Sequence, residues 1–144
     1  MSGPRQQITE GEFAGWERSD SDDFERYSGP YYERSEPDGR RRIAFRAEAR
    51  HMNGHGVMHG GCLMTFADAA LFTISHDARA GQRGVTLQLA GDFLEPVPEG
   101  AWVEATGEVV RGGGKTIFVR GMVTADGTAA LSFNGIVRKI GERR

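Results

Sequence analysis

Alternating apolar and polar positions mark the segments that are expected to form strands. From Ile43 to Ala49, every second side chain is apolar, whereas Arg42, Arg46 and Glu48 lie on the opposite side. This period of two predicts a strand with one buried face. Further strands are predicted at 31–33, 85–94, 102–110, 116–124 and 129–137. Turn-forming residues separate several of them, at 37–39, 112–114 and 125–128.

A different periodicity appears between Cys62 and Ser75, where nearly every residue is apolar. On a helical wheel one face is formed by Leu63, Phe66, Ala67, Ala70 and Ile74, and the apolar surface is continued by Met64, Leu71 and Phe72. A helix that is apolar nearly all round is expected to be buried. Asp68 is the one ionisable carboxylate in it, and a buried charge is costly unless it has a partner or a function.

The order of these elements predicts the fold. One or more strands precede the long helix, and four strands follow it as an antiparallel meander. A single helix that is buried on all sides requires a sheet curled around it. The sequence therefore predicts an α+β fold, with an antiparallel sheet wrapped around one long central helix. Free strand edges would favour oligomerisation.

Composition indicates one domain of 144 residues. Residues 1–28 form a polar arm or a short helix with an acidic run (Asp20, Asp22, Asp23, Glu25), and Phe13 and Trp16 suggest that this arm lies on the domain formed by 29–144. The net charge of −2 gives no case for non-specific nucleic-acid binding. Without a membrane-length apolar run or a signal-peptide pattern, a cytoplasmic protein is expected. Cys62 is expected to be a reduced, packed thiol.

Two apparent motifs are rejected. His51, His55 and His59 are spaced by four residues, which would suit a zinc site on a helix, but the four glycines among and just after them disfavour a helix there. No metal is therefore expected. The segment 114–116 imitates the end of a phosphate-binding loop, but Val109 stands where the motif requires glycine.

Gly60 and Gly61 begin the apolar helix, and the first backbone N–H groups of a helix have no partner within it. These donors suit a carbonyl oxygen that becomes an oxyanion, and Asn53 and His59 are placed to assist. With Asp68 further along the helix, the pattern is compatible with hydrolysis of an activated acyl group. An alternative of equal weight is that the glycines only allow the helix to pack closely. Asp68 would then bind a nearby hydroxyl such as that of Thr65.

The pattern Asn53-x5-His59-Gly60-Gly61-x6-Asp68, with residues 84–86 opening the next strand, resembles the hotdog-fold acyl-CoA thioesterases of the phenylacetate-pathway (PaaI-like) group. The similarity covers roughly residues 29–139, and the order of elements agrees with that fold. The resemblance implies a thioester hydrolase that acts on acyl-CoA. Hotdog dehydratases carry a different His-and-Pro-Gly signature, which is absent here.

The resemblance also implies roles for particular residues. Asp68 would be the nucleophile or general base, the Gly60 N–H the oxyanion donor, and Thr86 would help to position water. Asn53 and His59 would fix the thioester, at a site built across a homodimer interface, with two dimers often forming a homotetramer. Substrate or CoA contacts are expected at Gly61, Arg111, Lys115, Arg138 and Lys139. No cofactor is expected, because coenzyme A is part of the substrate.

The sequence leaves two alternatives open. One is a non-catalytic acyl-CoA-binding protein, and the other is a dehydratase or hydratase on the same fold. The acyl pocket is also open, because Met58, Met64, Leu71, Phe72 and Phe93 suit either a pocket or the core.

Overall fold

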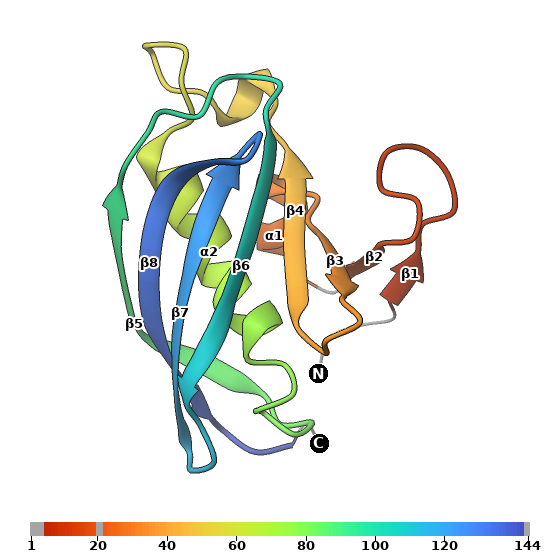
Figure 1. The fold of residues 1–144 in the computed structure, drawn as a ribbon, viewed down its shortest axis with the longest axis vertical. Helices are drawn as coiled ribbons and strands as arrows, with labels where there is room; N and C mark the ends of the chain where they lie inside the picture. Colours follow the sequence, from red (N-terminus) through yellow and green to blue (C-terminus); the bar gives the residue numbers. More distant parts are fainter. Residues whose placement is uncertain (1–4, 20–21, 143–144) are drawn as a thin grey trace.

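The computed structural model describes residues 5–19 and 22–142. Its strands form one eight-stranded antiparallel sheet in the order β1-β2-β3-β4-β6-β7-β8-β5 (Figure 1). The strands are β1 (Arg5–Gln7), β2 (Glu17–Ser19), β3 (Tyr32–Ser35), β4 (Arg41–Arg46), β5 (Gly84–Phe93), β6 (Trp102–Arg111), β7 (Thr116–Ala125) and β8 (Thr128–Lys139). The helices are α1 (Asp23–Ser28) and α2 (Gly60–Ile74), with a 3-10 turn at Ala49–His51.

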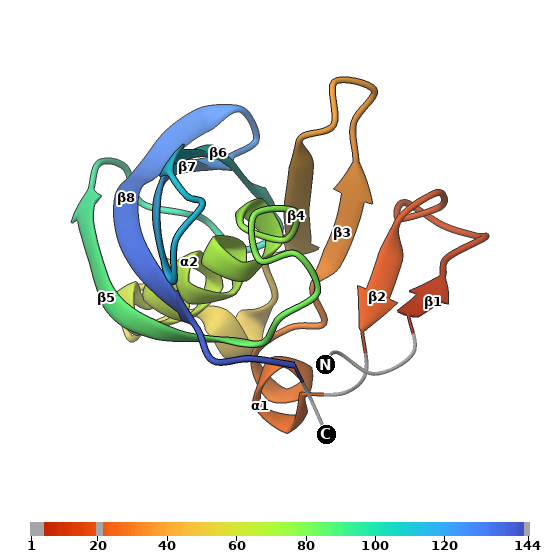
Figure 2. The same cartoon turned by 90° about the horizontal axis from the view of Figure 1, so that it is seen from below.

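The predicted α+β architecture is confirmed. The sheet curls around α2, which contacts β4, β5, β6, β7 and β8 (Figure 2). Phe45, Phe66, Leu71 and Ile117 are among the large side chains that are almost fully buried between helix and sheet. Each fully buried side chain of this size stabilises the fold by roughly 1.5–3 kcal/mol.

The prediction of a four-strand meander after the helix is wrong. Only β6, β7 and β8 follow one another as sheet neighbours, whereas β5 pairs with β8 and β6 pairs with β4. The connection from β5 to β6, residues 94–101, is long enough to pass from one part of the sheet to another, unlike a two-residue hairpin. The alternating pattern shows which face of a strand is buried but not which strand lies beside it.

The expectation that α2 is buried on all sides is also wrong. Leu63, Phe66 and Ala70 are buried, but a stripe that includes Thr65 and Asp68 is only half-buried. The sheet leaves one side of α2 open, between β5 and β3, and α1 lies on that side (Figure 2). Asp68 lines a cleft there together with Glu25 of α1 and Glu33 of β3. One curled sheet covers only part of the circumference of a helix.

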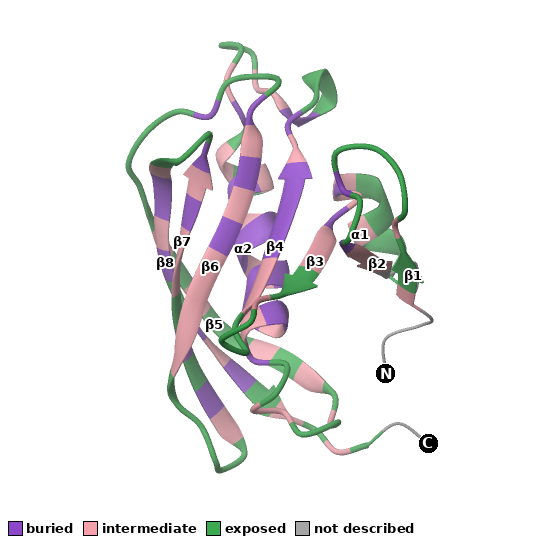
Figure 3. Cartoon of the chain, turned by 45° about the vertical axis from the view of Figure 1, so that its right-hand side comes forward, coloured by how far each residue is buried: buried purple, intermediate pink, exposed green. Residues whose placement is uncertain are grey.

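The N-terminal arm extends the sheet, since β1 pairs with β2 and β2 pairs with β3. Phe13 and Trp16 are buried, and both rings contact Trp102. They also cover Ala44, so that residues 43–45 of β4 are buried in succession, the purple part of this strand in Figure 3. A short helix does form in the arm as α1, while Asp20 lies outside the described residues. The division into two parts at residue 28 stays a prediction.

In the described ranges, no helix is both long and apolar enough to cross a membrane.

Candidate active site

Asp68 lies halfway along α2, and its carboxylate is fixed by a neighbouring strand. The hydroxyl of Thr86 on β5 donates a hydrogen bond to Asp68 Oδ1 at 2.6 Å. Thr65, the partner considered from sequence, instead donates to the carbonyl oxygen of Gly61 at 2.9 Å. In the described part of the chain Asp68 has no ion-pair partner. The structure therefore brings Asp68 and Thr86 together and leaves the carboxylate without a neutralising cation.

His59 organises the start of α2 as its N-cap. Its Nδ1 accepts a hydrogen bond from the Gly61 N–H at 2.9 Å. Its carbonyl oxygen accepts from the N–H groups of Cys62 and Leu63 at 2.9 and 3.1 Å. Across residues 5–19 and 22–142, the Gly60 N–H has no hydrogen-bond partner. The free donor of this turn is thus the Gly60 N–H.

An apolar ring stands beside this donor. A Cβ atom placed on Gly60 would lie 3.3 Å from Cζ of Phe93, at the end of β5. The Phe93 side chain is 56% exposed, so it is not part of the core. Glycine at position 60 allows a bulky group to share this space with the ring. The sequence of Phe93 and its neighbours suits either a pocket or the core, and the structure places this ring at the N-terminal end of α2.

Asn53 shapes the loop that precedes α2. Its Oδ1 accepts hydrogen bonds from the backbone N–H groups of His55, at 2.8 Å, and Val57, at 3.3 Å. This Asx-type turn uses the side-chain oxygen, whereas the Nδ2 donors have no partner among the described residues. Asn53 therefore keeps its amide N–H groups available in the loop that precedes α2.

His51, in contrast, is a structural histidine. It is buried, its Nδ1 accepts from the Glu48 N–H at 2.9 Å, and its Nε2 pairs with the carbonyl oxygen of Ser28 at 2.8 Å. Burial lowers the pKa of this imidazole, which favours the neutral ring that this arrangement requires. No group of three metal-binding side chains occurs in the ranges that the structure describes.

The two parts of the predicted site are separated within one chain. Gly60 and Asp68 are eight positions apart on α2, which corresponds to about 12 Å along the helix axis. A reacting carbonyl group must lie about 3 Å from both the oxyanion donor and the nucleophile. In the predicted site, Asn53, His59 and Gly60 would therefore form one half-site, and Asp68 and Thr86 would form another.

A polar cleft of about 790 Å³ opens beside Asp68. Its walls come from α1, β3, the C-terminal half of α2 and the segments before β5 and after β8. Among the pocket candidates, Phe72 lines this cleft, whereas Met58 and Leu71 are buried in the core. The lining includes Arg5, Asp22, Glu25, Tyr31, Glu33, Ile43, Thr73, His76, Arg79 and Arg83. Sequence patterns could not assign these residues to the cleft, because they come from distant segments.

The four basic residues expected to contact coenzyme A lie at the end of the sheet opposite the His59–Gly60 turn. Arg111 ends β6, Lys115 follows in the β6–β7 connection, and Arg138 and Lys139 end β8 (Figure 1). The Lys139 N–H donates to the Lys115 carbonyl oxygen at 2.8 Å, which holds the two segments together. In the described parts of the chain, no ion pair or side-chain hydrogen bond involves these four cations.

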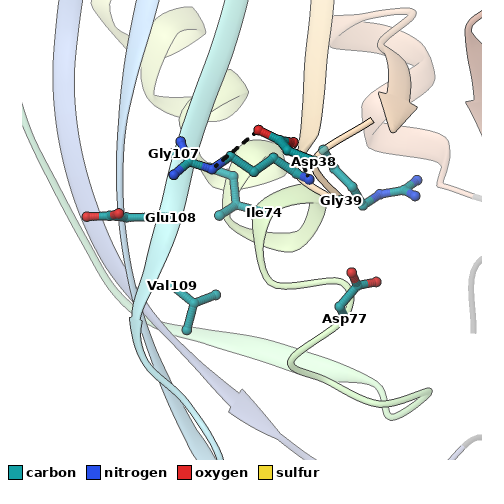
Figure 4. Close-up of a pocket in the computed structure, with 9 residues that line it drawn as sticks. Asp38, Gly39, Ile74, Asp77, Gly107, Glu108 and Val109 are labelled. Atoms are coloured by element: carbon teal, nitrogen blue, oxygen red, sulfur yellow. Dashed lines mark hydrogen bonds and ion pairs between the residues drawn. The ribbon is translucent and has the colours of Figure 1, made fainter. Parts of the chain in front are cut away.

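A second depression, of about 350 Å³, lies near the end of α2 (Figure 4). It is lined by Asp38, Gly39, Arg40, Arg41, Ile74, Asp77, Gly107, Glu108 and Val109. None of the predicted site residues belongs to this lining.

Known proteins resemble this chain in sequence and in fold. The thioesterase superfamily matches residues 55–131. The TT0310 protein of Thermus thermophilus is 31% identical, with a TM-score of 0.71 over 83% of this chain and 98% of its own. A mutant of phenylacetic acid degradation protein PaaI from the same organism is 30% identical, with a TM-score of 0.71 over 83% of this chain and 100% of its own. A hypothetical thioesterase protein of Streptococcus pneumoniae, solved with coenzyme A, shares the fold at 23% identity, with a TM-score of 0.70 over 79% of this chain and 88% of its own.

Proposed function

Because this chain belongs to the thioesterase superfamily, we propose that it hydrolyses acyl-CoA thioesters to the free acid and coenzyme A. The observation that carries the proposal is the Asp68 carboxylate, which has no cationic partner among the described residues and is held by Thr86 at the edge of a cleft. An unneutralised carboxylate on a mostly apolar helix is costly, and catalysis explains its presence. The similarity to a PaaI protein and to a thioesterase solved with coenzyme A supports the same activity.

In the proposed reaction, Asp68 acts as general base or as nucleophile. As general base, its carboxylate takes a proton from water while the water oxygen attacks the thioester carbonyl carbon. The carbonyl oxygen becomes an oxyanion, which accepts a hydrogen bond from the Gly60 N–H. The C–S bond then breaks, and the coenzyme A thiolate leaves and is protonated. As nucleophile, Asp68 would form a mixed anhydride that water hydrolyses afterwards.

Two copies of the chain are needed to assemble this site. The separation of about 12 Å along α2 prevents Gly60 and Asp68 of one chain from reaching the same carbonyl group. β5 is an edge strand, and its Val85 and Leu87 side chains are 41% and 55% exposed. Such an edge is suited to pairing with a second copy. We therefore propose a homodimer, or a tetramer of two dimers, in which the His59–Gly60 turn of one chain faces Asp68 of the other.

Coenzyme A enters this proposal only as part of the substrate, and no cofactor takes part. The cations at 111, 115, 138 and 139 are candidates for its phosphate groups, because they are not neutralised by other described residues. Asn53 and His59 would hold the thioester group of the substrate, and the Nδ2 donors of Asn53 are available for this. Gly61 would contribute to the same contact, because its N–H is bonded to the His59 ring.

The test compares the wild type with Asp68→Asn, which preserves the shape of the side chain. We expect kcat to fall by about 10²–10⁴-fold, because the base or nucleophile is lost. Turnover is measured on phenylacetyl-CoA and on straight-chain substrates from butyryl- to palmitoyl-CoA. Asp77→Asn is the matched control, since the Asp77 side chain is 78% exposed just beyond α2.

Unchanged turnover of the Asp68→Asn protein would show that the mechanism is wrong. Binding of acyl-CoA without turnover by the wild type would identify a non-catalytic acyl-CoA-binding protein. Conversion of enoyl-CoA or 3-hydroxyacyl-CoA would instead identify a hydratase or dehydratase.

A further inference from the structure

The N-terminal arm contributes a second carboxyl group to the cleft at Asp68. Helix α1 packs beside α2 on the side that the sheet leaves open (Figure 2). Glu25 on α1 and Asp68 on α2 line the same cleft, and the charge of Asp68 contributes to raising the pKa of Glu25. The match to the thioesterase superfamily begins only at residue 55, so that α1 lies outside the matched segment.

The environment of Glu25 is unfavourable for its charged form. The side chain is half-buried, and in the described part of the chain its carboxyl group has no hydrogen-bond or ion-pair partner. Burial, followed by the carboxylates of Asp22, Glu33 and Asp68, raises the pKa of Glu25 to about 7. Arg5 is the nearby cation that opposes this shift, but its guanidinium is bound to Glu33 at 2.6 Å.

Tyr31 also belongs to the lining of the cleft, but its hydroxyl is buried inside the protein. Burial raises the pKa of this phenol, whereas a hydrogen bond with the Ser28 side chain acts in the opposite direction. Tyr31 therefore contributes its ring to the wall of the cleft. Glu25 is the half-buried polar group that a bound polar substituent would satisfy.

The composition of the cleft sets the kind of acyl group that it accepts. Ile43 and Phe72 provide apolar walls for methylene groups. The lining also contains five carboxylates and three guanidinium groups, which belong to Asp22, Glu25, Glu33, Asp68 and Glu142 and to Arg5, Arg79 and Arg83. A cleft of about 790 Å³ is within the range of ligand pockets. A plain alkyl chain would leave Glu25 without a partner.

We propose that this cleft holds the acyl group of the substrate, and that Glu25 is a specificity-determining residue that selects acyl groups bearing a hydroxyl or ammonium substituent. The inference rests on the proposed thioesterase function. An O–H or N–H donor on the acyl chain binds the Glu25 carboxylate. The arm thus supplies substrate selection, while α2 and β5 supply the reacting groups.

The test uses butyryl-, hexanoyl- and octanoyl-CoA, each with its ω-hydroxy and ω-amino derivative. For the wild type we expect kcat/KM to be about tenfold higher for a polar derivative than for its methyl-ended parent at one or more chain lengths. Glu25→Leu should remove this preference, mainly through KM. Asp23→Asn is the matched control on the same helix, because the Asp23 side chain is 88% exposed. It should keep the preference.

A second variant separates recognition from folding. Glu25→Gln keeps the shape of the side chain and cannot ionise. In the wild type the preference for the ω-amino over the ω-hydroxy substrate should rise as the pH passes about 7, because Glu25 then becomes an anion. In Glu25→Gln the same ratio should not change with pH. The charged and titratable groups that face Glu25 are Arg5 of β1, Asp22 beside it, Tyr31, Glu33 of β3 and Asp68 of α2.

The outcomes are distinguishable. A wild type that hydrolyses methyl-ended and polar substrates equally well at every chain length, or a preference that Glu25→Leu retains, overturns this inference and leaves the proposed function intact. A wild type that hydrolyses no acyl-CoA overturns both. A preference for the ω-hydroxy or for the ω-amino series supports the inference and identifies which substituent the cleft selects.

Discussion

At the scale of single residues, Gly60 contributes its backbone N–H group to the proposed site, since it has no side chain. His59 engages the N–H of Gly61 with its ring and those of Cys62 and Leu63 with its carbonyl oxygen, so the Gly60 N–H is the donor left for a ligand. This allocation depends on the rotamer of His59. The histidine–glycine motif in the sequence therefore indicates which turn supplies a donor. The hydrogen bonds of the structure identify that donor as the Gly60 N–H.

The role of this donor is tested by Gly60→Pro. Proline is well tolerated as the first residue of a helix, and His59 has the extended ψ of 135° that a residue before proline prefers. The substitution therefore removes the N–H without removing the helix. We expect kcat to fall by about 10²–10³-fold.

Gly60→Ala is the matched control, because it also adds a Cβ atom near Phe93 but keeps the N–H. It should retain most of the activity, since the exposed Phe93 ring is free to move. Equal losses in the two variants, measured as kcat on one acyl-CoA, would rule out the Gly60 N–H as the oxyanion donor.

At the scale of elements, the N-terminal arm is joined to the domain by backbone contacts at one end of α1. Arg50 donates to the carbonyl oxygens of Tyr27 and Gly29, and His51 binds that of Ser28. At the other end of the arm, Arg5 binds Glu33, which also accepts from Thr73 of α2 at 2.7 Å. These contacts hold α1 over the open side of α2 although none of its residues is fully buried.

This placement has a measurable cost, because Glu25 is carried into an acidic, half-buried position. Its pKa is raised from 4.5 to about 7, so the folded state binds this proton more tightly than the unfolded state does. The free energy of unfolding therefore falls as the pH rises from about 4.5 to 7. Glu25→Gln avoids this cost. We expect the variant to be more stable than the wild type by about 1–3 kcal/mol above pH 7.

Urea unfolding of both proteins at several pH values measures this difference. The gain should disappear near pH 4, where Glu25 is protonated in the folded and the unfolded states alike. Asp23→Asn should show no comparable dependence on pH. A gain of equal size at low and high pH would mean that the carboxyl group of Glu25 is not the cause.

At the scale of the whole molecule, the two edges of the sheet differ. The arm adds the three-residue strands β1 and β2 at one edge, whereas the other edge is the ten-residue strand β5 with exposed apolar side chains. Short edge strands discourage further pairing, and long apolar ones favour it. The arm thus leaves β5 as the edge that suits a second copy, next to the proposed half-site of Asp68 and Thr86.

If the site is shared between two chains, two inactive variants should complement each other. A dimer of Asp68→Asn with Gly60→Pro keeps one site in which Asp68 of one chain faces Gly60 of the other. Refolding the two variants together in equal amounts should restore about a quarter of the wild-type activity, since about half of the dimers are mixed and each has one intact site.

Analytical ultracentrifugation of the refolded mixture establishes that dimers have formed. Each variant refolded alone serves as the control and should remain inactive. A mixture that forms dimers without regaining activity would show that the two half-sites do not face each other across the interface.

Much of the fold follows from local pattern. The strands beginning at 85, 102, 116 and 129 and the turn at 37–39 all appear close to their predicted positions, because burial on one face imposes a period of two. β1 and β2 were not predicted, since three-residue strands carry too little alternation to be recognised. The outer face of β4 was not recognised as buried, because Phe13 and Trp16 come from a distant part of the sequence.

The amino-acid sequence is sufficient to specify most elements, the central helix, and the presence of Asp68 within it and of Gly60 at its start. Tertiary packing was required to show that Thr86 binds Asp68, that Glu25 enters the same cleft, and that β5 lies at a free edge. The physical reason is the separation along the chain over which each effect acts. Periodicity and turn chemistry act between residues a few positions apart, whereas the cleft and the half-sites depend on which distant segments pack together.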